Sequence, residues 1–244
     1  MSGKKMLIVA AHMGDFLWRC GGTIAKHAKA GDEVHVVVLS YGLRGESNEL
    51  WKIEGMTKEQ GRMLRKSESE EAAKMLGINN IELWDYEDYP FETTRDKLDR
   101  LVVKLRTFRP DFIVTHDKID AFNPDHGLVS AFVVRACQVS SGAGVVLGDT
   151  EVGARRIPIF GYEHHYPELC DFKPGVFVDI TDVFELKLRA MGCYKSQAFM
   201  AKQYVARAEL RGSQCSSFSG NKKCKYAEAF TIFYPIAQYG DLVY

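Results

Sequence analysis

Two histidines and one aspartate lie where they could bind a metal ion together. His12 and Asp15 are three residues apart directly after an apolar run, and His126 belongs to a polar segment much further along the chain. Two imidazoles and one carboxylate leave coordination positions free, which is typical of a catalytic rather than a structural metal site. The spacing alone does not decide the matter, because Asp15 could instead cap the helix that follows it.

Further polar residues come directly after three other apolar runs. They are Arg44, Gly45, Glu46 and Ser47 after the second run, His116, Asp117, Asn123, Asp125 and His126 after the fourth, and Glu163, His164 and His165 after a later one. Ligands of open α/β sheets bind at the carboxyl ends of the strands. We therefore expect these residues to line one crevice together with His12 and Asp15.

The elements that would position these residues alternate between strand and helix. Apolar runs predict strands at 6–10, 33–40, 81–84, 112–115, 159–162 and 176–179. Helical periodicity and end signals such as Gly31, Gly77 and Pro110 predict helices at 16–30, 58–76, 93–109, 127–138, 182–196 and 201–211. The Gly-rich stretch 140–158 is expected to be a loop with a short strand or hairpin.

This order of elements predicts an α/β fold. Right-handed crossovers would give a Rossmann-like, doubly wound, mostly parallel sheet with helices on both faces and a C-terminal elaboration. No repeat or linker divides the chain, so we expect a single domain over residues 1–244.

Composition excludes some classes of function. The 32 basic and 32 acidic residues give a formal net charge of zero, which argues against a general nucleic-acid binder. No apolar run is long enough to span a bilayer, and the first one is too short for a signal peptide. The six cysteines include no C-x-x-C pair, as expected for reduced thiols in a cytoplasmic protein.

Three motifs resemble those of the LmbE-like (PIG-L) superfamily. A-H-M-G-D at 11–15, followed by G-G-T-I at 21–24, is similar to A-H-P-D-D-E…G-G-T-I; N-P-D-H at 123–126 is similar to H-P-D-H; and Y-A-E-A-F at 226–230 matches a C-terminal element. The resemblance implies one divalent ion per chain, bound by His12, Asp15 and His126. Zinc is the first choice, although these ligands could also hold manganese or iron. A homo-oligomer, a trimer or hexamer by analogy, is also implied.

Two departures from the family pattern concern catalysis. Most members are N-deacetylases whose general base is the first aspartate of P-D-D, and Gly14 stands at that position. Asn123 replaces the histidine that opens H-P-D-H. Amide hydrolysis needs a positioned base near the metal, so this chain either performs different chemistry or is inactive.

One branch of the family, the 4-oxalomesaconate (4-carboxy-2-hydroxymuconate) hydratases of aromatic-acid ring cleavage, is similar at 15–22, 39–47 and 163–169. This resemblance implies a zinc-dependent hydratase that adds water to a conjugated C=C bond. Glu46 and His165 would be its acid–base pair, with His164 as the alternative to His165. The substrate would be a polycarboxylate, and the expected substrate-binding residues are Arg19, Arg44, Asn123 and Lys195.

Two other functions remain open. The first is an N-deacetylase of N-acetylglucosamine-like substrates that uses Glu46 or Asp125 as a displaced base. The second is a non-catalytic metal- or ligand-binding module. A deacetylase should need a carboxylate at position 14, so Gly14 favours the hydratase.

Overall fold

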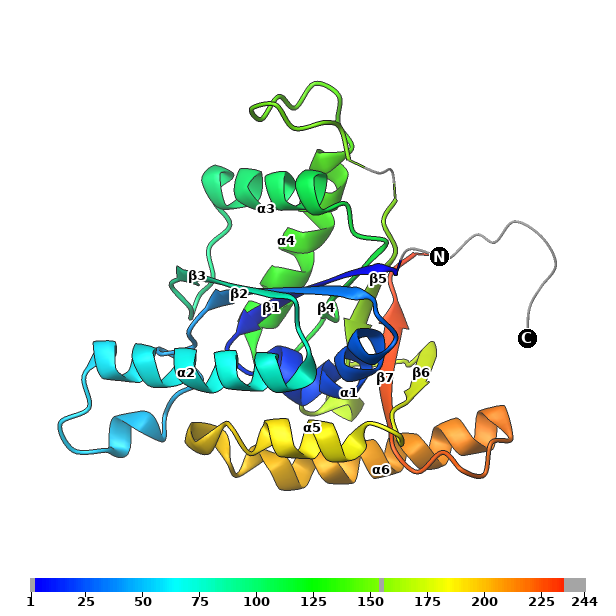
Figure 1. Ribbon diagram of the computed structural model, residues 1–244. Coiled ribbons are helices and arrows are strands. Elements are labelled where there is room, and N and C mark those ends of the chain that lie inside the picture. The colour runs from blue at the N-terminus through cyan, green and yellow to red at the C-terminus, as the bar shows by residue number, and fades with distance from the viewer. Residues whose placement is uncertain (1–2, 154–155, 235–244) are drawn as a thin grey trace.

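A seven-stranded sheet forms the centre of the protein, for which a computed structural model describes residues 3–153 and 156–234 (Figure 1). The strands are β1 (Lys5–His12), β2 (Glu33–Ser40), β3 (Asn80–Tyr86), β4 (Phe112–His116), β5 (Ile159–Tyr162), β6 (Val176–Asp179) and β7 (Ala227–Ile232). Their order is β3-β2-β1-β4-β5-β7-β6. The first five strands in this order are parallel, while β7 is antiparallel to both β5 and β6. The expected α/β class with a mostly parallel sheet is confirmed.

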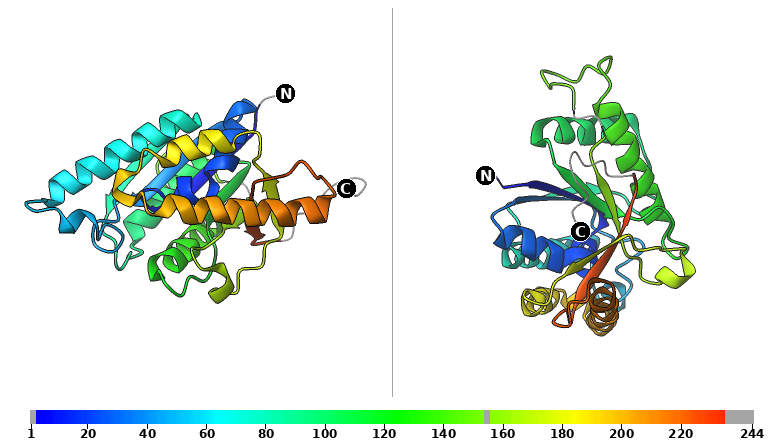
Figure 2. Two further views of the ribbon diagram at one scale, coloured as in Figure 1. Left: turned by 90° about the horizontal axis from the view of Figure 1, so that it is seen from below. Right: turned by 90° about the vertical axis from the view of Figure 1, so that its right-hand side faces the viewer.

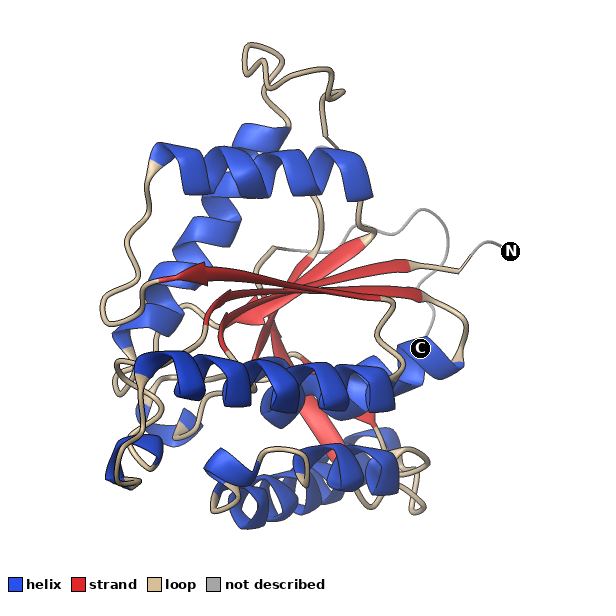
Figure 3. Ribbon diagram, turned by 60° about the vertical axis from the view of Figure 1, so that its left-hand side comes forward, coloured by secondary structure: helices blue, strands red, loops and turns tan. Residues whose placement is uncertain are grey.

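Helices cover both faces of this sheet, as Figures 1 and 3 show. They are α1 (Asp15–Lys29), α2 (Lys58–Leu76), α3 (Arg95–Phe108), α4 (Pro124–Ser140), α5 (Phe184–Met191) and α6 (Met200–Ser219), with short 3₁₀ turns η1 (Leu50–Lys52), η2 (Pro167–Leu169) and η3 (Lys195–Gln197). Helices α3 and α4 lie on one face, and α1, α2, α5 and α6 lie on the other (Figure 2). No helix in the described ranges is long and apolar enough to cross a bilayer.

Side chains along β1 point alternately to the two faces of the sheet, which shows why two helical layers form. Met6, Ile8 and Ala10 belong to the core beneath α1, whereas Leu7 and Val9 belong to the core beneath α3 and α4. Successive side chains of a strand point to opposite faces, so a strand that is apolar at every position must be covered twice. The continuous apolar runs seen in the sequence are therefore the reason for the doubly wound architecture.

Several helix boundaries follow the local signals in the sequence. Thr57 and Gln60 form a capping box at the start of α2, and Gly77 ends the helix in the left-handed conformation. Other predicted boundaries were wrong. Helix α4 begins at Pro124 rather than at residue 127, because proline is well suited to a first helical turn. Helix α5 ends at Met191, well before the predicted residue 196.

The C-terminal part differs more from expectation. Helix α6 runs eight residues beyond the predicted end at 211, and β7 was recognised only as a motif, not as a strand. Its insertion between β5 and β6 makes this edge of the sheet antiparallel. Between residues 140 and 158, the described residues contain no strand.

Helix α1 is interrupted at Cys20, whose backbone angles are not helical. The second segment begins with free backbone amides at Gly22 and Thr23, and the carboxylate of Glu228 on β7 accepts a hydrogen bond from each, at 2.8 and 2.7 Å. The ammonium of Lys187 neutralises that carboxylate at 2.7 Å and also donates to the carbonyl of Trp18. A buried ion pair on the last strand and α5 thus holds the two segments of α1 together.

The position of the crevice follows from the strand order. The chain moves outward from β1 through β2 to β3 and then returns to place β4 on the other side of β1. Loops that leave the carboxyl ends of β1 and β4 therefore diverge, which opens a binding crevice at this point. His12 ends β1 and His116 ends β4.

Candidate metal centre and active-site pocket

Three elements bring the predicted metal ligands together. His12 ends β1, Asp15 begins α1, and His126 lies in the first turn of α4. The carboxylate of Asp15 lies 3.6 Å from Nδ1 of His12 and 3.7 Å from Nε2 of His126. Gly14 makes the tight connection possible, because its φ of 99° is in the left-handed region that favours glycine.

These side chains fit a divalent ion. Nδ1 of His12 and Nε2 of His126 are buried and have no hydrogen-bond partner among the described residues. Ligand atoms of His12, Asp15, His126 and Glu46 all lie within 4.8 Å of one another. Buried polar nitrogens without partners are costly, and a shared cation would satisfy both at once.

A carboxylate holds the second ring nitrogen of each histidine. Nε2 of His12 lies 3.2 Å from Asp125, and Nδ1 of His126 lies 2.8 Å from Asp120. Asp125 in turn accepts hydrogen bonds from the backbone amides of Tyr89 and Phe91. Such contacts set the tautomer and orientation of metal-binding imidazoles. Sequence reasoning did not assign this role to Asp120, and only its place in the polar loop before His126 hinted at it.

Electrostatics favour ionised carboxylates at this site. Burial acts to raise the pKa of Asp15, but His116 and His126 hold it well below its ordinary value. Burial likewise opposes ionisation of Glu46, and the neighbouring His12 keeps the pKa of that carboxyl below its usual range. The imidazole of His116 has a lowered pKa because of burial and the proximity of His126. Nε2 of His116 also accepts a hydrogen bond from the amide of Ala11, which fixes the ring against the end of β1.

Glu46 comes closer to the metal ligands than expected. Its carboxylate lies 3.3 Å from Nδ1 of His12 and 3.5 Å from Nε2 of His126, and it accepts a hydrogen bond from the side chain of Asn123. Asp88 holds the turn before it by accepting from the amides of Arg44 and Gly45. Glu46 can therefore act either beside a bound ion or as a further ligand of it.

The structure separates the two neighbouring histidines of the later loop. His165 lines a pocket of about 420 Å³ beside the metal cluster, and its Nδ1 has no partner in the described ranges. His164 is buried behind this pocket, 3.1 Å from Asp120. Of the two, only His165 lies where it could contact a substrate in this pocket.

Helix α6 holds the loop that carries His165. Gln203 and Arg207 both donate to the carbonyl of His165, and Arg207 and Arg211 both bind the carboxylate of Glu163. Four polar contacts from one helix therefore define where this loop lies.

The four expected substrate-binding residues lie in different places. Arg19 and Asn123 line the pocket. Arg44 is exposed and lies near Glu87 on the surface, and Lys195 is exposed on η3; neither lines the pocket. The loop geometry that turns both side chains outward has no signature in the sequence.

Side chains fill the space next to Gly14. A Cβ atom at this position would lie 2.9 Å from Nε1 of Trp18, 3.0 Å from the ring of Tyr194 and 3.1 Å from Oε1 of Gln197. Trp18 donates to Gln197, which also donates to the carbonyl of Glu46. The volume into which a carboxylate at position 14 would project is thus occupied.

Comparison with known proteins gives a consistent result. The family model described as PIG-L, GlcNAc-PI de-N-acetylase, matches residues 7–137. The chain is 37% identical to a 4-oxalmesaconate hydratase of Pseudomonas putida, over 95% of this chain and 90% of the relative.

Solved structures agree with the sequence relatives. The crystal structure of GalB, the 4-carboxy-2-hydroxymuconate hydratase of Pseudomonas putida, superposes with a TM-score of 0.92 at 36% identity, covering 98% of this chain and all of that chain. N,N'-diacetylchitobiose deacetylase from Pyrococcus horikoshii gives a TM-score of 0.74 at 25% identity, covering 94% and 84%.

Proposed function

The chain belongs to the PIG-L family of GlcNAc-PI de-N-acetylases, and within that family we propose that it is a zinc-dependent hydratase. The reaction is the addition of water to a conjugated C=C bond of an unsaturated keto or enol polycarboxylic acid. The substrate is 4-oxalomesaconate (4-carboxy-2-hydroxymuconate) or a close analogue. The hydratases of Pseudomonas putida support this assignment by their near-complete coverage of the chain.

The filled space beside Gly14 carries the argument against deacetylation. A deacetylase of this family places its base at this position, whereas Trp18, Tyr194 and Gln197 occupy that volume here. Substitution alone could not restore the base, because the positive φ and the close neighbours both disfavour a side chain. The remaining acid–base candidates near the metal cluster lie on other loops.

Glu46 and His165 are the proposed acid–base pair. A divalent ion held by His12, Asp15 and His126 would supply Lewis-acid stabilisation of negative charge on the substrate's oxygens. Glu46 is kept ionised by His12 and oriented by Asn123, so it enters the reaction as a carboxylate. His165 lines the pocket with a free ring nitrogen, so it can take or give the second proton. The pocket between them is large enough for a six-carbon to seven-carbon acid.

We further propose one ion per chain, a cytoplasmic location and a homo-oligomer, a trimer or hexamer by analogy with the family. Zinc is favoured because two histidines and a carboxylate suit it. Metal analysis of the purified protein would test the number and identity of the ions, and light scattering after size exclusion would test the oligomeric state.

The decisive experiment offers two substrates to the same metal-analysed protein. We expect loss of the dienol absorbance of 4-carboxy-2-hydroxymuconate and no acetate release from an N-acetyl amino sugar. Acetate release with an unchanged dienol signal would replace the hydratase by a deacetylase. Bound metal with no turnover of either compound would indicate a binding module.

A further inference from the structure

Tyr204 on α6 has a buried hydroxyl with no hydrogen-bond partner among the described residues. The side chain lines the pocket of about 420 Å³ that is also lined by Asp15, Glu46 and His126 of the candidate metal cluster. Burial raises the pKa of Tyr204 to about 12, although the charge of Arg19 acts in the opposite direction. The hydroxyl is therefore an uncharged donor at neutral pH. A buried hydroxyl without a partner destabilises the folded protein, so its presence calls for an explanation.

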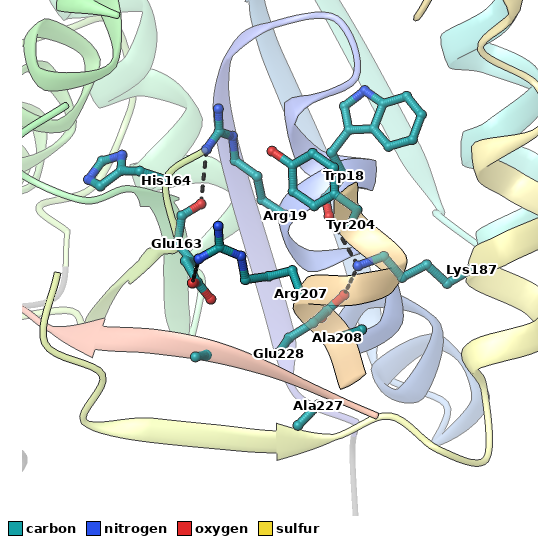
Figure 4. A pocket seen from close by; sticks show the side chains of 11 residues that line it. Trp18, Arg19, Glu163, His164, Lys187, Tyr204, Arg207, Ala208, Ala227 and Glu228 are labelled. Atoms are coloured by element: carbon teal, nitrogen blue, oxygen red, sulfur yellow. Dashed lines mark hydrogen bonds and ion pairs between the residues drawn. The ribbon is translucent and has the colours of Figure 1, made fainter. Parts of the chain in front are cut away.

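Arg19 lies beside Tyr204 and is also incompletely paired. Its Nε donates to Asp15 and its Nη1 donates to the carbonyl of Glu163, whereas Nη2 makes no hydrogen bond to any described residue. Figure 4 shows Arg19, Tyr204 and Trp18 around a small cavity of about 20 Å³. The same three residues line the larger pocket, so this is where the two cavities meet.

We propose that Arg19 and Tyr204 form a subsite for one carboxylate group of the substrate, at the α1–α6 side of the pocket. Nη2 of Arg19 and Oη of Tyr204 are its two donors. The ligand class is an organic acid that carries a carboxylate besides the one nearest the metal cluster.

The chemistry of the pocket favours a carboxylate there. Asp15, Glu46 and Asp120 give the metal side negative charge, and Arg19 is the one lysine or arginine among the described residues that line the pocket. Arg44 and Lys195, the other expected anion partners, lie outside it. Besides the proposed ion, a polycarboxylate therefore has one buried cationic side chain available, and charge-assisted hydrogen bonds to it are among the stronger polar contacts in proteins.

This inference rests on the proposed function for the identity of the substrate, but binding tests it without turnover. The probes are tricarballylate and glutarate, which differ only by the central carboxylate, and calorimetry of the metal-loaded protein gives the dissociation constants. We expect Tyr204→Phe to weaken tricarballylate binding by roughly 10-fold, as for a hydrogen bond to a charged group. The preference of the wild type for tricarballylate over glutarate should shrink in the variant.

Thermal stability is a second readout, and it should not fall when substrate binding falls. Tyr204→Phe removes a hydroxyl without a partner, so the Tm should stay the same or rise while binding falls. Tyr194→Phe is the matched control, since its buried hydroxyl is paired with Ser69 at 2.8 Å and does not line the pocket. This variant should lose Tm and keep the wild-type dissociation constants.

Unchanged affinity together with a lower Tm would contradict the proposed subsite. If Tyr204→Phe bound both acids with wild-type affinity and lost Tm, the hydroxyl would be held by a water molecule in the small cavity and not by substrate. Failure of the proposed function is recognisable separately. In that case the wild type would not hydrate 4-carboxy-2-hydroxymuconate but would still prefer tricarballylate through Tyr204.

Discussion

The two halves of the sheet contribute different things to the pocket. Every member of the candidate metal cluster, including Glu46, precedes α4 or lies in its first turn, at or shortly after the carboxyl ends of the parallel strands β1, β2 and β4. His165 and Tyr204 come from the half that begins with β5, where the sheet becomes antiparallel. The family model matches residues 7–137, which is the metal-binding half. The two halves therefore supply different parts of the candidate site, with the proposed metal ligands in the first half and the pocket-lining His165 and Tyr204 in the second.

The halves also differ in how their functional side chains are held. In the metal-binding half, each histidine is fixed by a carboxylate that is itself bound to backbone amides or loop residues. In the other half, side chains of α6 hold a loop through its backbone carbonyl and through Glu163. Substitutions in the first half should therefore affect metal binding, and substitutions in the second should affect binding of the substrate and proton transfer.

Removal of a metal ligand should have the largest effect. His126→Ala is expected to abolish both metal binding and turnover while the fold persists, because the residue lies at the sheet edge and not in the two apolar cores. Metal content, turnover and circular dichroism test this, with His27→Ala as the control, since His27 pairs with Asp32 away from the site. Full metal occupancy in His126→Ala would exclude the proposed centre.

Substitution of the proposed acid–base pair should have the second largest effect on turnover. Glu46→Gln keeps the shape of the side chain and removes its basicity, so turnover should fall by ~10²–10⁴-fold. His165→Ala should cause a loss of turnover of similar size with metal content unchanged. If the two residues act together, the double variant should lose far less turnover than the product of the two single losses. If Glu46→Gln also lost its metal, Glu46 would be a ligand of the ion. Near-normal turnover in both single variants would rule out the proposed hydratase mechanism.

Asp120 should have an intermediate effect on metal binding. Asp120→Asn keeps the size and shape of the side chain but removes its charge, which weakens the contact that orients His126. Metal affinity should therefore fall by ~10–100-fold. A competition titration with a chelator would measure this. Asp117→Asn serves as a neighbouring control, because Asp117 accepts from Thr231 and does not contact His126. Equal affinity in Asp120→Asn and the wild type would contradict the orienting role.

The smallest expected effect concerns the pH profile. Burial and the charges of Arg19 and Arg207 lower the pKa of His165 to about 4, although Asp120 and Glu46 act to raise it. His165 is therefore neutral in the free enzyme at neutral pH and can accept a proton. If it is the base, kcat/KM should fall at acidic pH only as the pH approaches about 4.

Arg207→Gln tests the cause of this shift. Removal of a positive charge makes the imidazolium less unfavourable, so the pKa of His165 should rise and the acidic limb of kcat/KM should move to higher pH. Lys202→Gln, an exposed change on the same helix, should leave the limb in place. An unmoved limb in Arg207→Gln would mean that another group controls it.

Local patterns predicted the metal-binding half better than the other half. Strand β2 and helix α2 have the predicted bounds because a continuous apolar run and a terminal glycine, Gly77, are signals that lie within or directly beside the segment. His12, Asp15 and His126 follow from the motifs. Strand β7 was missed as a strand because Glu228 and Thr231 interrupt the continuous apolar run by which the other buried strands were recognised.

Residues whose role depends on distant contacts could not be predicted. Gln197 and Tyr204 acquire their roles from contacts with residues many positions away, and no spacing along the chain records them. Asp120 lies six positions before His126, but this spacing alone does not distinguish an orienting carboxylate from an ordinary loop residue. Arg44 and Lys195 have the right chemistry for anion binding, but the local backbone turns them toward solvent. A residue type predicts what a side chain can do, whereas its direction depends on the packed structure.

The break in α1 has a consequence for the order of events during synthesis. Glu228 caps the second segment of this helix from 206 positions further along the chain. A nascent chain that has emerged up to His126 already carries every metal ligand, yet the helix with Asp15 and Arg19 still lacks its carboxylate cap, and Lys187 has no counterion until β7 is made. The proposed metal site should therefore be completed late: a nascent chain that stops before β7 would be a poor metal acceptor, and the ion would bind well only after β7 has joined the sheet.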